Sequence, residues 1–311
     1  MMIKALMVLL GGLSGYLLFG AAGALGAGAV LVNLFTPLPP AVLGMRLGPA
    51  WGLAAVGLTA AAILATSGEL AVQLYLLQFG LPAALLPMLL RRGVAWDRAI
   101  AMTLGVMVLC GGLVLLGVSS GTGQSPLTFI DAQIDKEIDQ ALTMMQEFAG
   151  TEQTPESAES LREVTAGMGE LMRRAYPAML LVVCAVLQLV TVAALALVAR
   201  PAVLPGAPFA RWRSPDWLIW GLIAAGFAVV FAEGQVQSVA INALIILLPV
   251  YFLQGLAVVE HFLAQKGLSP WLRGISYLFL LVVNPLPMIV TGVGVFDLWA
   301  DFRKPRQRKE E

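Results

Sequence analysis

Two aspartates stand four residues apart where the last apolar stretch ends, in the sequence GVGVFDLWADFRK. On a helix, Asp297 and Asp301 share one face, so they could act as a functional acid pair, although a metal would require further ligands. Alone the two would repel, and Arg303 is close enough to relieve that repulsion. Trp299 suits the headgroup layer of a membrane. We therefore predict a membrane-exit motif, with the functional acid pair as the alternative.

The composition decides what kind of protein surrounds this motif. Of the 311 residues, 59% are apolar and only 12% are charged, and the mean hydropathy is +0.85. A soluble chain carries about 25% charged residues. The sequence therefore predicts an integral membrane protein whose first partner is the lipid bilayer. The formal net charge of zero gives no basic field for nucleic acid.

Few residues are suited to catalysis. The chain has a single histidine, His261, and two cysteines, Cys110 and Cys184, both within apolar runs. No zinc spacing, G-x-S-x-G or phosphate-binding glycine loop is present. We predict that the protein is not an enzyme and has no catalytic residue, cofactor or metal site. Gly11 and Gly15 lie in an apolar run and are typical of a helix-packing face.

The apolar runs predict an all-α polytopic bundle with about eight to ten membrane segments, since a spanning helix needs about 20 apolar residues. The candidate spans are 5–36, which is long enough for two helices, 49–66, 70–90, 98–118, 177–199, 216–232, 236–264 and 271–299.

Basic residues orient these spans. They fall at alternate ends, which can all be cytoplasmic at once; they include Lys4, Arg46, Arg91, Arg92, Arg98, Arg200, Arg211, Arg213, Lys266 and Arg273. The basic tail after residue 300 reaches the same side only if the last stretch breaks at Asn284–Pro287 into two short helices that fold back. We expect this break, and therefore both termini in the cytoplasm.

A polar loop interrupts the apolar pattern. Residues 119–176 hold ten acidic and four basic residues, as expected on the extracytoplasmic side. Apolar residues at helical spacing predict two amphipathic helices, the second of which runs into the span at 177. One interpretation is that the loop lies on the bundle or on the membrane surface. The other is that it is a lid or docks a membrane-protein partner through residues 127–172. The chain is thus divided into N-terminal spans (1–118), the loop (119–176), C-terminal spans (177–299) and a cytoplasmic tail (300–311).

Polar side chains within the spans are costly and therefore informative. One interpretation is that they line a cavity and bind a small polar ligand; the other is that their amides link helices to one another. The candidates for the ligand site are Gln73, Gln78, Asn242, Gln254, Glu260 and Asn284.

Three stretches resemble a known family: PLPPAVLGMRLG (37–48), FARWRSPDWLIW (209–220) and NALIILLPVYFLQGLAVVEHFL (242–263), together with the closing motif. They are similar to the YybS-like family of bacterial multi-spanning membrane proteins, which carries the label of a domain of unknown function. The resemblance covers essentially the whole chain and implies the bacterial inner membrane.

A fainter likeness, in LGPAWGLAAVGLTAAA (47–62), is to the S components of energy-coupling-factor transporters. S components bind a small molecule within a helical bundle and dock on an ATP-driven module. This likeness favours a transport-related small-solute-binding module. The alternative is a scaffold or assembly factor for an envelope complex.

Overall fold

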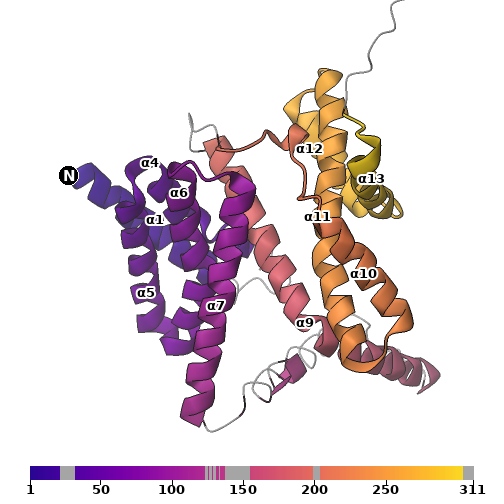
Figure 1. The fold of residues 1–311 in the computed structure, drawn as a ribbon. Coiled ribbons are helices and arrows are strands. Elements are labelled where there is room, and N and C mark those ends of the chain that lie inside the picture. The colour runs from indigo at the N-terminus through magenta and orange to yellow at the C-terminus, as the bar shows by residue number, and fades with distance from the viewer. Residues whose placement is uncertain are drawn as a thin grey trace, which may run out of the picture. The chain divides into compact units, whose positions relative to one another are not determined.

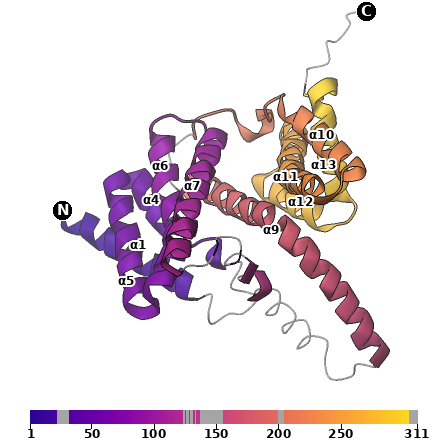
Figure 2. The ribbon, with the colours of Figure 1, turned by 60° about the horizontal axis from the view of Figure 1, so that its bottom comes forward.

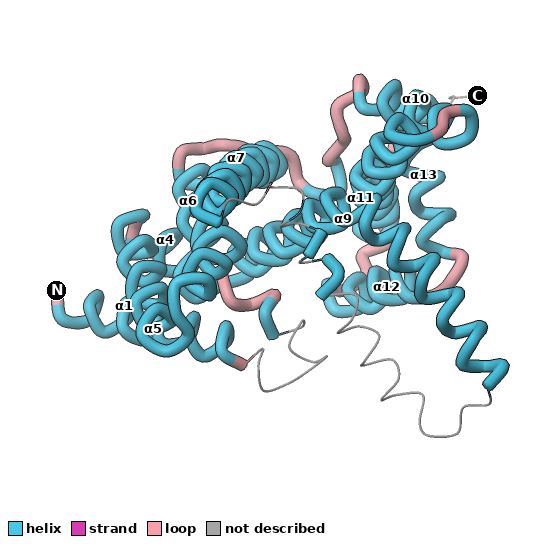
Figure 3. The backbone as a smooth tube through the Cα atoms, turned by 90° about the horizontal axis from the view of Figure 1, so that it is seen from below, coloured by secondary structure: helices cyan, strands magenta, loops and turns pink. Residues whose placement is uncertain are grey.

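The computed structural model describes residues 1–21, 32–122, 125, 128, 131–132, 134–136, 155–198 and 204–303. In these ranges the chain forms helices joined by short connections, and no strand occurs among them (Figure 1, Figure 3). The predicted all-α helical bundle is confirmed. Within the predicted partner-docking segment, 127–172, residues 137–154 and several before them lie outside the described residues.

The helices gather into two compact units. The first contains 1–126 and 183–206, and the second contains 127–182 and 207–311. The long helix α9 (Pro155–Val198) contributes to both units, because the boundary falls between Val182 and Val183. Helix α9 continues past residue 177 to Val198, which confirms that the helix before residue 177 runs into the following span.

The first unit is built on a helix that folds back on itself. Its elements are α1 (Met2–Gly20), α4 (Leu38–Leu47), α5 (Pro49–Tyr75), the π-helical turn η2 (Leu76–Gly80), α6 (Leu81–Arg91) and α7 (Trp96–Thr122). Gly68 has φ +83°, which interrupts α5 between the predicted spans 49–66 and 70–90. Arg91 Nη1 then donates to the carbonyl of Met45 at 2.6 Å, so the chain has returned to where α5 began.

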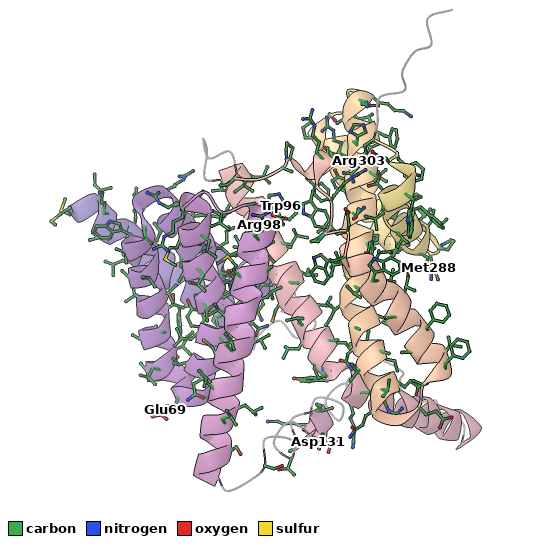
Figure 4. The ribbon with its side chains drawn as sticks, in the orientation of Figure 1. Glu69, Trp96, Arg98, Asp131, Met288 and Arg303 are labelled. Atoms are coloured by element: carbon green, nitrogen blue, oxygen red, sulfur yellow. The ribbon has the colours of Figure 1, made fainter. Side chains whose placement is uncertain are left out.

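Figure 4 shows the same reversal, with Glu69 at one end of this unit and Trp96 and Arg98 at the other. The ammonium of Lys4 lies 5.8 Å from the ring centroid of Trp51, near the start of α5. Cations therefore gather at one end, where Asp97 also lies, and Glu69 lies at the opposite end. This distribution supports the predicted alternation of basic ends, while the orientation in the membrane stays a prediction.

Small residues allow α1 to approach its neighbours. A Cβ atom at Gly12 would lie 2.7 Å from Leu58 Cδ2, and one at Gly15 would lie 2.9 Å from Thr59 Oγ1. The hydroxyl of Thr59 donates to the carbonyl of Gly12 at 2.9 Å. Gly11 is also buried, against Leu43. The structure therefore places both predicted packing glycines, Gly11 and Gly15, at helix–helix contacts.

The second unit contains η3 (Phe209–Arg211), α10 (Leu218–Phe231), α11 (Gly234–Gln265), α12 (Pro270–Val282) and α13 (Leu286–Ala300), which Figure 2 shows gathered around α11. Helices α12 and α13 are bent by 104° at the connection between them. The Asn284–Pro285 peptide bond there is cis. The predicted break at Asn284–Pro287 is confirmed.

Fewer helices satisfy the length of a membrane span than the eight to ten predicted. Among the described residues five are long and apolar enough, or six if the bent pair α12–α13 crosses once. The runs 49–66 and 70–90 belong to one 43-residue stretch, and α10 has only 14 residues. Residues 22–31, where the second helix of 5–36 was expected, lie outside the described part.

Candidate functional site

The site begins with an unusually close contact between α11 and α13. A Cβ atom added at Gly294 would overlap the carbonyl oxygen of Tyr251, and one added at Gly255 would overlap that of Val290. Only glycine permits such an approach of two backbones. The contact brings the side chains of the neighbouring residues Gln254 and Asp297 together, and neither side chain is exposed.

Asp297 is the centre of a buried ion-pair cluster. Its Oδ2 accepts a hydrogen bond from the Arg303 guanidinium, which is only 7% exposed, and a second from Gln254 Nε2 at 3.3 Å. Arg213 Nε lies 3.7 Å from the same oxygen. A carboxylate without exposure would be costly to hold as an anion unless it is paired, and here two guanidiniums and an amide stabilise it.

The same cluster fastens the extended segment between η3 and α10. Gln254 Oε1 accepts from the backbone N–H of Ser214 at 3.1 Å and also from its hydroxyl. Arg303 Nη1 donates to the carbonyls of Ala210 at 3.2 Å and of Trp212 at 2.8 Å. Since the segment has no helical partners there, these side chains satisfy its backbone groups. Three separate parts of the chain therefore meet at Asp297.

Asp301 closes the outer side of the cluster. It follows α13 with φ +43°, a left-handed conformation that Asp tolerates better than most residues and that commonly ends a helix. Its carboxylate pairs with Arg213, whose side chain is 38% exposed. The two aspartates of the closing motif therefore share Arg213, while Arg303 pairs with Asp297.

A cleft opens beside these pairs. It has a volume of about 420 Å³ and is lined by Arg211, Arg213, His261, Gln265, Asp301 and Arg303. We call it the arginine cleft. His261 Nε2 and Gln265 Nε2 lie 2.9 Å apart on successive turns of α11. The six lining residues that the structure describes all carry polar side chains, but most of the surface they expose to the cleft is apolar, so the cleft suits a ligand that combines a charged or polar group with apolar parts.

Asn242, a predicted ligand-binding residue, repairs a break in α9. Pro177 lies inside that helix, and a proline there disturbs the backbone ladder. Asn242 Oδ1 accepts from the N–H of Ala178 at 3.1 Å, and its Nδ2 donates to the carbonyl of Arg174 at 2.5 Å. These are the two groups that pair with each other in an unbroken helix. The amide thus inserts into the opened turn and links α11 to α9.

Glu260 also joins helices. Its Oε1 accepts from Arg273 Nη1 at 2.8 Å, and its Oε2 accepts from the hydroxyl of Tyr277. Arg273 Nε in turn donates to the carbonyl of Leu268 at 2.8 Å. Glu260 therefore fastens the start of α12 to the end of α11 and does not line the arginine cleft.

The remaining candidates are not among the residues that line the cleft. In the first unit Gln73 is exposed and Gln78 is half-buried, and Asn284 is exposed at the bend before α13. Trp299 is 63% exposed on α13, as an aromatic residue at a membrane surface would be. Of the six amide and acid candidates, Asn242, Gln254 and Glu260 link helices in the way that the second interpretation describes.

Sequence reasoning missed most of the residues that line the cleft. Arg211, Arg213 and Gln265 were not among the ligand candidates, because they lie at chain positions read only as the ends of spans. Their gathering around Asp297 depends on contacts between residues far apart in sequence. A usable signal was the concentration of arginines in FARWR, directly before a span.

The second unit is thus the C-terminal part of an α-helical, multi-pass membrane protein with a buried ion-pair cluster at one end. The chain belongs to the family described as predicted membrane protein (DUF2232), whose sequence profile matches residues 16–298. This match confirms the resemblance to the YybS-like family. No curated protein and no solved structure was found to match the chain. The fainter likeness to S components stays a prediction.

Proposed function

We propose that this protein is a small-solute-binding module of the membrane, related to transport, and that the arginine cleft is its binding site. The observation that carries this proposal is a cleft lined by charged and amide side chains beside the Asp297 cluster, in a chain that is otherwise strongly apolar. Its volume of about 420 Å³ falls within the range of about 300–1,000 Å³ of small-molecule sites.

The rigidity of the cleft supports the same role. Burying Asp297 and Arg303 costs desolvation free energy, and ion pairs of this kind recover that cost only with good geometry. The cluster fixes the guanidiniums of two cleft residues before any ligand arrives. A preorganised site loses less conformational entropy when it binds. We expect binding without chemical turnover, since the sequence contains no nucleophile–base pair.

We further propose that the cleft faces the cytoplasm of a bacterium, at the inner membrane. The α12–α13 pair begins and ends near the end of α11. Glu260 of α11 pairs with Arg273 at the start of α12, and Gln265 of α11 lines the cleft together with Arg303, which follows α13. This supports a re-entrant pair that returns the basic tail to the side of the other basic clusters.

Thermal unfolding of the purified protein with a panel of vitamins and small metabolites, anionic and neutral, tests the function. We expect at least one compound to raise the midpoint, since a ligand that binds only the folded state stabilises it. The shift should disappear in Gln265→Ala, which alters the cleft, and persist in Gln73→Ala, which alters the first unit. No response to any compound would contradict the proposal.

The alternative role, a scaffold that docks a partner through residues 127–172, stays a prediction. Cross-linking from Ile134 in intact membranes tests it separately. A defined protein partner, trapped while the solute panel gives no response, would favour the scaffold.

A further inference from the structure

The arginine cleft is richer in cations than in acids. Three guanidiniums, those of Arg211, Arg213 and Arg303, face it, whereas the nearby carboxylates are Asp301 in the wall and Asp297 behind it. Among the described residues of this group, the guanidiniums outnumber the carboxylates by one. A positive excess in a partly enclosed site attracts an anion from solution.

The three arginines are not equally available. Arg303 is almost fully buried and is held by Asp297 and by two backbone carbonyls. Arg213 pairs with both aspartates but remains 38% exposed. Arg211, at the end of η3, is exposed, and no carboxylate pairs with it in the part of the chain that the structure describes. The excess charge therefore resides on the most accessible guanidinium.

The geometry points to a phosphate-type oxyanion as the ligand of the arginine cleft, and we propose that Arg211 binds it directly with Arg213 beside it. A guanidinium presents paired N–H donors that match two oxygens of a phosphate group. The cleft admits a group of that size. This inference rests on the proposed function, since it names the chemical class of the solute.

Two sources can supply such a group: a soluble phosphate or the headgroup of a phospholipid. Trp217 and Trp220, just after the arginine-rich segment, are 70% and 72% exposed, and Trp299 is 63% exposed. Exposed tryptophans are typical of the headgroup layer, where anionic lipids attract basic clusters. The phosphate chemistry is common to both sources, so the experiment has an arm for each.

The test uses the full-length protein in a phosphate-free detergent. In one arm, thermal unfolding is followed against inorganic phosphate, with sodium chloride at matched ionic strength. In the other arm, it is followed in mixed micelles containing phosphatidic acid, with phosphatidylcholine as the comparison. Arg211→Gln is the test variant, and Arg92→Gln, an exposed arginine of the first unit, is the matched control.

We expect phosphate or phosphatidic acid to stabilise the wild type and Arg92→Gln. Arg211→Gln should bind about ten- to a hundredfold more weakly, because a hydrogen bond to a charged group contributes about 1.5–3 kcal/mol. A response to free phosphate assigns a soluble ligand, and a response to phosphatidic acid alone assigns a lipid headgroup.

The proposal is overturned if neither compound stabilises beyond its comparison, or if Arg211→Gln responds as the wild type does. A third outcome separates the two proposals. If neutral solutes stabilise the protein through Gln265 while neither phosphate nor phosphatidic acid does, the proposed function stands and only the oxyanion ligand is refuted.

Discussion

Replacing Asp297 by asparagine tests the role that the structure gives this residue. The change keeps the size of the side chain and removes its charge. Arg303, at 7% exposure, would then be a buried cation whose remaining partners are the carbonyls of Ala210 and Trp212. A buried cation without its counter-ion is strongly destabilising.

The magnitude follows from the geometry. At the 3.7 Å between Arg213 Nε and Asp297 Oδ2, the Coulomb attraction is about 4 kcal/mol at an effective dielectric constant of about 20. Solvent screening reduces the contribution of Arg213 to this attraction, since Arg213 is partly exposed. Loss of one partner of a buried pair costs about 3–5 kcal/mol. We expect the cost of Asp297→Asn to lie near the lower limit of this range, because Arg303 retains two carbonyl acceptors.

The free energy of unfolding is measured in mixed micelles with increasing dodecyl sulfate, using tryptophan fluorescence. Asp301→Asn is the matched control, since asparagine also tolerates the left-handed conformation. The Asp301–Arg213 pair is more exposed, at 22% for Asp301 and 38% for Arg213. Asp301→Asn should therefore lower the free energy of unfolding by about 1 kcal/mol or less. The double variant Asp297→Asn, Arg303→Gln removes both buried charges, so it should recover part of the free energy of unfolding that Asp297→Asn loses. Equal stability of the two single variants would refute the reasoning.

Two further changes test how the helices are joined. Gly294→Ala should destabilise the protein by about 3 kcal/mol, at the upper end for overpacking, because its Cβ atom would overlap the carbonyl of Tyr251. A Cβ atom at Gly292 would meet nothing within 4 Å, so Gly292→Ala should leave the stability unchanged. Equal unfolding midpoints of the two alanine variants would contradict the close contact between α11 and α13. Asn242→Leu should cost about 1–3 kcal/mol by leaving two backbone groups of α9 unpaired. In a Pro177→Ala background, where the helix can restore its own hydrogen bond, the measured cost should fall sharply, and an unchanged cost would exclude the repair role.

The sequence predicted the features that depend on local chemistry. The break at Asn284–Pro287 followed from two prolines, each of which removes a backbone donor. The helical class followed from the length and apolarity of the runs. Among the described residues, five or six helices reach the length of a span. The predicted runs 49–66 and 70–90 are the two arms of the reversal at Gly68, and part of the run 5–36 lies outside the described residues.

The candidate site was only partly predictable. Gln254 was identified because a buried amide in an apolar helix needs partners, but the partners themselves, Ser214 and Asp297, lie about 40 residues away on either side. Asp297 was interpreted as part of a membrane exit, with a functional acid pair as the alternative, and its complete burial was not foreseen. Its burial depends on the backbone contact at Gly294, which periodicity does not disclose.

All of the functional inferences require that α13 end where α11 ends, since only then do Arg303 and Arg213 share the Asp297 cluster. Cysteine accessibility in intact cells tests this directly, in a background without Cys110 and Cys184. Glu233, before α11, should become labelled by an impermeant reagent when replaced by cysteine. Cysteines at Lys266 and Phe302 should both be protected until the cells are permeabilised. Labelling at Phe302 in intact cells, with Lys266 protected, would place the two helix ends on opposite sides and contradict the arginine cleft.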